Sequence, residues 1–511
     1  MIVGILLTIF FIIVVGVWAG RKATSNEAFT TGGGKANAWI VCGTLMGTLI
    51  SGQATVGSAQ LAFAYGISAW WFTIGAALGA LVLALFFVVP LRHSGSITLM
   101  EIIGKEFGKK AETIGSCLCV IGIFISIVAQ IIASSALLTT LFPSVAFLPA
   151  ALMAMGLMII YVVFGGLWGA GLGGIVKMLL LYISATLAGV AVWHLGHGFE
   201  GLVDSITQLH TQTAIGEIQQ LQTAPAVRHQ YGNFIARGPM KDIGSCLSLI
   251  LGVLSTQTYA QALWAARSDK AARRGALLSA FLIPPIGAAC TLVGMYMRAH
   301  YVTANELQQL ELMGTSLPAG MDVIQNSVQA FPVFVTRHLP GFFGGVVLGT
   351  LFVTIVGGGS GLTLGASTIL MRDLVAPLRQ RFAQLRHRPS PETRLWQTRL
   401  IIVLLLLVAV TVSTTITGSF LNDLGFLSLG LRATAVLCPL VAALWLPGRF
   451  KSTFILTSMI LGTLMLLAAK LTHLPGDPLF WGLGLSILIA LMGWKRKRNR
   501  IKKSLFSMLQ T

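Results

Sequence analysis

The residues of this chain best suited to chemistry are a few polar side chains inside long apolar stretches. From residue 43 to 66 the run GTLMGTLISGQATVGSAQLAFAYG is apolar enough to lie in a membrane, yet Gly52 and Gly57 interrupt it. Gln53 and Thr55 lie between those glycines. A broken helix is tolerated at membrane depth where it lines a cavity, and its half-helix ends can then hold a substrate or an ion. This stretch therefore predicts the centre of a transport site.

A second apolar stretch, residues 243–266, is interrupted in the same way. The run Ser255-Thr256-Gln257-Thr258 puts consecutive polar side chains at mid-span, where they need a cavity. Such amides and hydroxyls either bind a polar solute between the two breaks or bond neighbouring helices and hold the bundle together. On the first interpretation, the residues expected to contact substrate are Gln53, Ala54, Gln257, Thr258, Gln261 and Arg432.

Arg432 lies near the middle of the apolar stretch 421–446, where a charge is costly and should face protein or water. Asp423 is the one carboxylate well within a predicted span, and at nine residues away it is too far along the helix to pair with Arg432. Arg432 either attracts an anionic substrate, or belongs to a gate, or bonds the carbonyls of a broken helix. Together with Lys177 it makes the membrane interior positive, which favours an anionic or zwitterionic solute.

Composition places the chain among membrane proteins. Of 511 residues, 55% are hydrophobic and 10% are charged, whereas about a quarter of a soluble domain is charged. The net charge of +19 does not indicate a nucleic-acid partner, because the basic residues cluster in short loops, as they do beside the cytoplasmic face of a membrane. The expected class is an all-α polytopic protein of a bacterial plasma (inner) membrane.

Catalytic and metal-binding patterns are missing from the sequence. The six cysteines fall inside apolar stretches and predict core residues, and no histidine lies mid-span to hold a metal. Neither glycine run fits a phosphate-binding loop, because Gly32–Lys35 is followed by Ala36 rather than by Ser or Thr, and Gly357–Gly361 lacks a lysine. We therefore expect no enzyme, no metal centre and no obligate protein partner, but a small-molecule solute and membrane lipid.

Apolar runs of about 20 residues predict about thirteen transmembrane helices, which puts the termini on opposite sides. Lys and Arg crowd the alternate loops and the tail 495–511, so we expect the N-terminus outside and the C-terminus inside. The predicted spans are 2–20, 38–65, 68–90, 113–140, 146–164, 172–194, 243–266, 275–298, 341–370, 397–417, 421–446, 452–471 and 478–494.

Several motifs, in order along the chain, resemble the sodium:solute symporter family, whose members import proline, sugars, sialic acid, pantothenate and similar solutes. The motifs are Phe29–Gly34, Ile50–Gly57, Ala64-Tyr65-Gly66, Thr98…Glu101…Phe107-Gly108, Gly165–Trp168, Gln261–Ala266 and Ser367-Thr368…Arg372-Asp373.

The resemblance implies a leucine-transporter-type core of two five-helix repeats with inverted topology. It implies a secondary active transporter that imports a small polar solute by alternating access; the alternative is a membrane sensor or receptor that binds a solute without net transport. The expected parts are a first helix and cytoplasmic loop (1–37), the first repeat (38–195), an extracellular loop (196–242), the second repeat (243–446), two peripheral helices (447–494) and a basic cytoplasmic tail (495–511).

The resemblance also implies a sodium site, and here the sequence departs from the family. Two backbone carbonyls of that site map to Gly47 and Ile50, which any residue can supply. The two hydroxyls that relatives contribute fall on Gly357 and Gly358, whose side chains offer no oxygen. The site is therefore expected to be degenerate.

A Thr-Asp pair that lies near the sodium site in relatives corresponds to Gly173 and Gly174, and the glutamine that follows it corresponds to Lys177. On one interpretation the Lys177 ammonium occupies the sodium site, so that transport is coupled to protons or to no ion. On the other, Lys177 snorkels to the inner membrane surface. The coupling ion is then Na+ or H+, and no other cofactor is expected.

Overall fold

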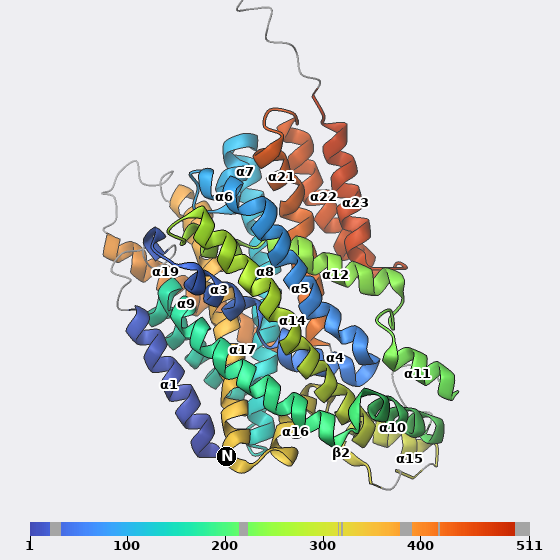
Figure 1. Ribbon diagram of the computed structural model, residues 1–511. Coiled ribbons are helices and arrows are strands. Elements are labelled where there is room, and N and C mark those ends of the chain that lie inside the picture. Colours follow the sequence, from blue (N-terminus) through green and yellow to red (C-terminus); the bar gives the residue numbers. More distant parts are fainter. Residues whose placement is uncertain are drawn as a thin grey trace, which may run out of the picture.

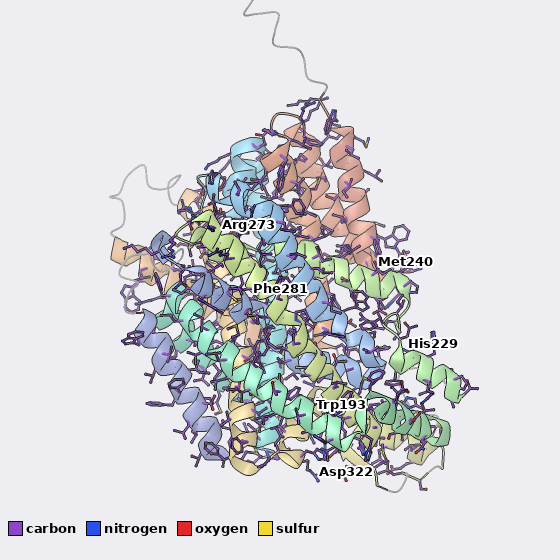
Figure 2. The ribbon with its side chains drawn as sticks, in the orientation of Figure 1. Trp193, His229, Met240, Arg273, Phe281 and Asp322 are labelled. Carbon is purple, nitrogen blue, oxygen red and sulfur yellow. The ribbon has the colours of Figure 1, made fainter. Side chains whose placement is uncertain are left out.

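The structure, a computed structural model, describes residues 1–20, 32–213, 223–314, 316–317, 320–378, 391–416 and 420–495. Among these residues, eight helices are long and apolar enough to cross a membrane, or nine when the bent pair α12–α13 is one span, and three shorter apolar helices join them. The all-α class is confirmed, whereas the total of thirteen spans stays a prediction. Exposed apolar side chains such as Trp193 and Phe281 point outward from the helices (Figure 2), where lipid is expected.

The first part of the chain forms one long helix and then the first broken helix and its neighbours. Its elements are α1 (Ile2–Gly20), η1 (Gly32–Gly34), α3 (Ala38–Leu49), η2 (Gln53–Gly57), α4 (Ser58–Tyr65), η3 (Gly66–Trp70), α5 (Trp71–Val82), η4 (Leu83–Phe87), α6 (Val88–His93), α7 (Leu99–Phe107), α8 (Lys109–Leu141) and α9 (Phe147–Leu195).

The second part holds the other broken helix, the short elements of two long loops, and the last helices. Its elements are α10 (Gly198–Thr213), α11 (Ala224–Gly232), α12 (Pro239–Leu254), α13 (Gln257–Trp264), α14 (Asp269–His300), β1 (Tyr301–Thr303), α15 (Ala304–Leu312), β2 (Asp322–Ile324), η5 (Ser327–Gln329), α16 (Ala330–His338), α17 (Gly341–Ile369), η6 (Leu370–Val375), α19 (Pro391–Ser413), α20 (Leu421–Arg432), η7 (Ala433–Leu437), α21 (Cys438–Trp445), α22 (Ser452–Leu471) and α23 (Pro478–Met492).

The first predicted break is present. Asn37 caps α3 by accepting a hydrogen bond from the Ile40 amide, and α3 ends where Ile50 adopts an extended backbone with φ −88° and ψ 99°. The chain then passes through η2, a π-helical turn of the kind that often marks a functional site. After α4 the helix stops at Gly66, whose φ of 65° and ψ of −139° favour glycine.

The second predicted break lies between α12 and α13, which meet at an angle of 45°. The long run α9 also contains a sharp turn, at Gly166, with φ 52° and ψ −153°. Tyr161 Oη donates to the Gly169 carbonyl at 3.3 Å, and a Cβ at Gly173 would overlap the same hydroxyl. In one straight helix twelve residues would span about 18 Å. The chain therefore folds back at Gly166, and α9 consists of two helices, as the two predicted spans require.

Short elements of the two long loops gather at one end of the molecule, which we call the cap end. It holds α10, α11, α15, α16 and the two parallel strands β1 and β2, in the register Tyr301↔Asp322 (Figure 1). The opposite end, which we call the α7 end, holds α6 and α7 (Figure 1). The first residue lies near the cap end and α23 finishes toward the α7 end. The charge distribution predicts that the cap end faces outside and the α7 end faces the cytoplasm.

Candidate functional site

The first break supplies unpaired carbonyls and is held open by a glutamine of α8. Because α3 ends at Leu49, the carbonyls of its last turn have no donor within the helix. Gln130 Oε1 accepts from the Gly52 amide at 2.8 Å, and Gln130 Nε2 donates to Ser51 Oγ at 3.1 Å. Gln130 thus satisfies part of the broken backbone and leaves carbonyls available on the α9 side.

Lys177, from the second helix of α9, fills that side of the break. Its Nζ donates to the carbonyls of Gly47 at 2.5 Å, Ile50 at 3.3 Å and Thr354 at 3.4 Å. The side chain is buried, with 2% of its surface exposed, so it does not snorkel to a membrane surface. None of the ion pairs among the described residues involves Lys177. The negative end of the α3 dipole contributes to balancing its charge.

Glycines bring the lysine to this position. A Cβ at Gly174 would overlap the carbonyl oxygen of Gly43, so α9 and α3 approach closely only because both residues lack side chains there. A Cβ at Gly357 would lie 3.4 Å from Lys177 Nζ, while one at Gly358 would overlap Ser51. The two positions at which the family resemblance implies hydroxyls therefore face the lysine head and the first break.

Arg432, at the end of α20, lies at the second break. Its guanidinium donates to Thr256 Oγ1 at 2.7 Å, Ser126 Oγ at 3.2 Å, Ser428 Oγ at 2.8 Å and the Ser428 carbonyl at 3.0 Å. These bonds use four of its five N–H groups, and 1% of the residue is exposed. Arg432 thus joins α20, α8 and the broken helix, mostly through hydroxyls rather than the carbonyls that the sequence analysis considered. Asp423 instead pairs with Arg237, at 3.5 Å.

A small cavity of about 20 Å³ lies between the two breaks and is lined by Gln53, Tyr259 and Arg432, among others. Pockets for organic ligands measure about 300–1,000 Å³, whereas this one has room for about one water molecule. The structure therefore brings together two of the six predicted substrate residues, one from each predicted repeat, in a closed conformation.

The other four predicted substrate residues are buried but do not line this cavity. Gln257 bonds the backbone before and at the start of α7, Thr258 donates to the Gly361 carbonyl at 3.3 Å, and Gln261 donates to Thr368 Oγ1 at 3.0 Å. Ala54 has 1% of its surface exposed. In this conformation the polar groups of α13 hold helices together, and their contact with substrate stays a prediction.

Two features of the site escaped the sequence analysis. Ser126 and Gln130 are four residues apart on α8, a spacing that puts them on one face of the helix and could have indicated their role. Asp373 is buried, with 2% exposed, and accepts hydrogen bonds from Thr98 Oγ1 at 3.0 Å and Ser116 Oγ at 3.3 Å. Asp373 lies beyond the end of its predicted span, where a carboxylate is expected to be exposed. Its burial depends on Thr98, which comes just before α7 and is distant in the sequence.

At the cap end a cavity of about 470 Å³ is lined by Gln60, Arg298, Glu306 and other residues. Arg298 pairs with Glu306 at 2.8 Å. Nearby, Tyr231 Oη lies 3.3 Å from His210 Nε2, while His210 Nδ1 lies 3.1 Å from the Ile206 carbonyl. Burial, followed by the Arg298 charge, lowers the pKa of His210 to about 3, so that this histidine is neutral in the folded protein.

Comparison with known proteins gives a consistent result. The chain matches the model of the sodium:solute symporter family over residues 29–467. An uncharacterized symporter of Bacillus subtilis is 24% identical over 405 residues, which is 77% of this chain and 71% of the relative. The sodium/glucose cotransporter of Vibrio parahaemolyticus is 23% identical, over 71% of this chain and 66% of the relative. High-affinity choline transporter 1 of Drosophila melanogaster is 21% identical, over 81% and 62%.

Among solved structures, the substrate-bound, outward-open state of a Na+-coupled sialic acid symporter matches with a TM-score of 0.72. The match covers 96% of this chain and 95% of that one at 17% sequence identity, and it confirms the leucine-transporter-type fold. The family model, the curated relatives and the fold agree that the chain belongs to the sodium:solute symporter family, as a multi-pass membrane transporter of a small-molecule solute and not an enzyme, with sodium as the coupling ion that the family implies.

Proposed function

We propose that this symporter homologue imports a small polar organic solute, anionic or zwitterionic, across a bacterial plasma (inner) membrane by alternating access. In this proposal the ammonium group of Lys177 takes the place of the sodium ion. Transport is then coupled to protons or to no ion.

The contacts of Lys177 carry this proposal. Sodium prefers hard oxygen ligands, and the carbonyls of Gly47 and Ile50 supply two of those that the family resemblance implies. Both already accept from Lys177 Nζ. A Cβ at Gly357 would lie 3.4 Å from Lys177 Nζ, but glycine has no side chain and so supplies no hydroxyl. Because two cations cannot share these oxygens, the residues present fit an ammonium better than a sodium ion.

A lysine can stand in for a coupling ion because its charge is not permanent. When the amine is protonated, it ties α9 to the end of α3 and to α17 as a bound cation would. When the proton leaves, the three carbonyls lose the charge that attracts them, and the helices are free to separate. Protonation and deprotonation of one residue would thus replace the binding and release of sodium.

The charges around the central cavity support the choice of solute. Arg432 lines the cavity, and Lys177 lies beside the same first break. None of the ion pairs among the described residues pairs a carboxylate with either. A positive interior attracts an anion or the carboxylate of a zwitterion, and it repels a simple cation.

The first test needs no solute. The purified protein is heated in sodium chloride and in choline chloride at equal ionic strength, since a ligand that binds only the folded state raises the midpoint of unfolding. We expect equal midpoints. A saturable rise that is specific to sodium would contradict the replacement of sodium by Lys177 and restore ordinary sodium coupling.

The second test uses liposomes and candidate organic acids and amino acids. We expect counterflow of the correct solute, and accumulation under an inward proton gradient if coupling is to protons. Lys177→Met should abolish that accumulation, whereas Lys110→Met, at an exposed position at the start of α8, should retain it. Binding of a solute without counterflow would instead favour a sensor or receptor.

A further inference from the structure

The first residue of α20, Leu421, is hydrogen-bonded to one residue of the cap-end cavity and to one residue of the central cavity. The Leu421 amide donates to Gln60 Oε1 at 3.0 Å, and the Leu421 carbonyl accepts from Gln53 Nε2 at 3.5 Å. Gln60 lines the cap-end cavity and Gln53 lines the central one. Gln60 Nε2 also donates to Ser327 Oγ at 3.4 Å. The side-chain amides of Gln53 and Gln60, both on the first broken helix, thus bind the carbonyl and the N–H of Leu421, between a residue of the central cavity and a residue of the cap-end cavity.

A similar pair of hydrogen bonds, made by Gln257, lies toward the α7 end. The Leu99 amide, the first of α7, donates to Gln257 Oε1 at 3.0 Å, and Gln257 Nε2 donates to the Ile97 carbonyl at 2.9 Å. Asp373 accepts from Thr98 between them. Gln257 begins α13. The second broken helix therefore holds the start of α7 against the core.

The two contacts follow one physical rule. The first amides of a helix have no partner within that helix, and a buried one must find an acceptor elsewhere. Gln60 and Gln257 supply that acceptor for α20 and α7, and each amide side chain also gives its NH2 group to another partner. In this closed conformation each glutamine uses both its carbonyl oxygen and its NH2 group in bonds to protein groups.

We propose that Gln60 with Gln53 forms the latch of the cap-end gate, and that Gln257 forms the latch of the α7-end gate. The inference rests on the alternating-access part of the proposed function. Opening toward the cap end breaks the contacts at Leu421 and keeps those at Leu99, and opening toward the α7 end does the reverse. The glutamines are positioning residues that set how often each side opens.

The consequence is reciprocal. Gln60→Leu keeps the approximate volume and removes hydrogen bonds that exist only with the cap-end gate closed, so it should populate the state open at the cap end. Gln257→Leu should populate the state open at the α7 end. The net worth of a buried hydrogen bond corresponds to a shift of about five- to tenfold in each equilibrium.

The experiment follows one cysteine from both sides. Ala76 lies on α5, lines the central cavity and has 1% of its surface exposed, so Ala76→Cys reports entry from either end. The reporter is placed in full-length protein whose six native cysteines are replaced by alanine or serine. A membrane-impermeant maleimide is applied to right-side-out and to inside-out vesicles, and the two labelling rates are compared.

We expect Gln60→Leu to raise the labelling rate from the cap end and lower it from the α7 end, and Gln257→Leu to do the opposite. Thr463→Val is the control, because it removes a buried hydrogen bond, from Thr463 Oγ1 to the Met459 carbonyl at 2.7 Å, within α22 and away from both closing contacts. It should leave the ratio of the two rates unchanged.

Variants that raise both rates together, or that leave the ratio unchanged, would overturn the latches while leaving transport intact. A parent protein that is labelled from neither side would instead contradict alternating access itself. Thermal unfolding checks that each variant is folded. If Gln257→Leu does not fold, Gln257→Glu keeps the acceptor for the Leu99 amide but, when ionised, loses the donor to Ile97, and the same change of ratio is expected.

Discussion

The two broken helices differ in the kind of cation that each one holds. With the predicted repeat boundaries, Lys177 belongs to the fifth helix of the first repeat and Arg432 to the fifth helix of the second. Each lies at the break in the first helix of its own repeat. Lys177 bonds three backbone carbonyls, while Arg432 bonds three hydroxyls and one carbonyl.

The difference indicates two roles for two buried positive charges. A guanidinium stays protonated in proteins and offers five donors in a fixed plane, so Arg432 acts as a permanent brace. An ammonium is a compact charge that can lose its proton, and two of its three carbonyl partners, those of Gly47 and Ile50, are the ones that the family resemblance assigns to the sodium site. In the proposed function, the first break changes its charge during transport whereas the second keeps it.

The largest expected effect comes from converting the first break into a sodium site. Lys177→Ala frees three carbonyls, and Gly357→Ser adds a hydroxyl close to where the ammonium lay. In the double variant, sodium at a hundredfold excess over its dissociation constant should stabilise the folded state by about 2.7 kcal/mol. Thermal unfolding in sodium chloride against choline chloride measures this. Equal midpoints in both salts would mean that the lysine head does not mark a cation position.

Replacing Arg432 by lysine tests whether its planar set of donors stabilises the second break. Arg432→Lys keeps the charge but cannot reach Thr256, Ser126 and Ser428 together, so we expect a loss of about 2 kcal/mol in unfolding free energy, the worth of one or two charged hydrogen bonds. The measurement is thermal or denaturant unfolding in detergent. Stability equal to that of the parent would show that charge alone, not the planar set of donors, matters at the second break.

The close approach of α3 and α9 gives a smaller effect. Gly174→Ala puts a methyl group against the Gly43 carbonyl and should cost about 1–3 kcal/mol of stability while displacing Lys177 from the break. Gly156→Ala is the control, because nothing lies within 4 Å of its Cβ in the first helix of α9. It should stabilise the protein by about 0.5–1 kcal/mol. Similar outcomes for the two variants would contradict the role of the glycine contact.

His210 differs from Lys177 and Arg432 because it is a buried basic residue that is neutral in the folded protein. The pKa of His210 is about 3 in the folded protein and about 6.5 when unfolded, so its contribution is complete above pH 6.5 and is lost as the pH falls toward 3. Between pH 7.5 and pH 6 the parent should lose about 1 kcal/mol more than His210→Gln. Unfolding midpoints at the two pH values check this, and parallel changes in both proteins would refute it.

Much of the fold followed from the sequence because its signals are local. The length of each apolar run predicted a span, glycines with neighbouring polar residues predicted the first break, and the consecutive polar residues 255–258 predicted the second. The departure of Gly357, Gly358 and Lys177 from the family pattern was readable for the same reason. The partners of Gln257 could not be predicted from the sequence, because Ile97 and Leu99 lie about 160 residues away along the chain and no local pattern links them to Gln257.

The amino-acid sequence by itself determined the class and the positions of the breaks, and it puts Gly357, Gly358 and Lys177 where the family resemblance implies sodium-site residues. Only the tertiary structure decided that Lys177 reaches the carbonyls of α3 and does not extend to the membrane surface. That outcome depends on the contact between Gly43 and Gly174, which sets the distance between two helices. Helix spacing in a bundle results from all the side chains packed at once, so the same lysine a few ångströms farther out would have reached water instead.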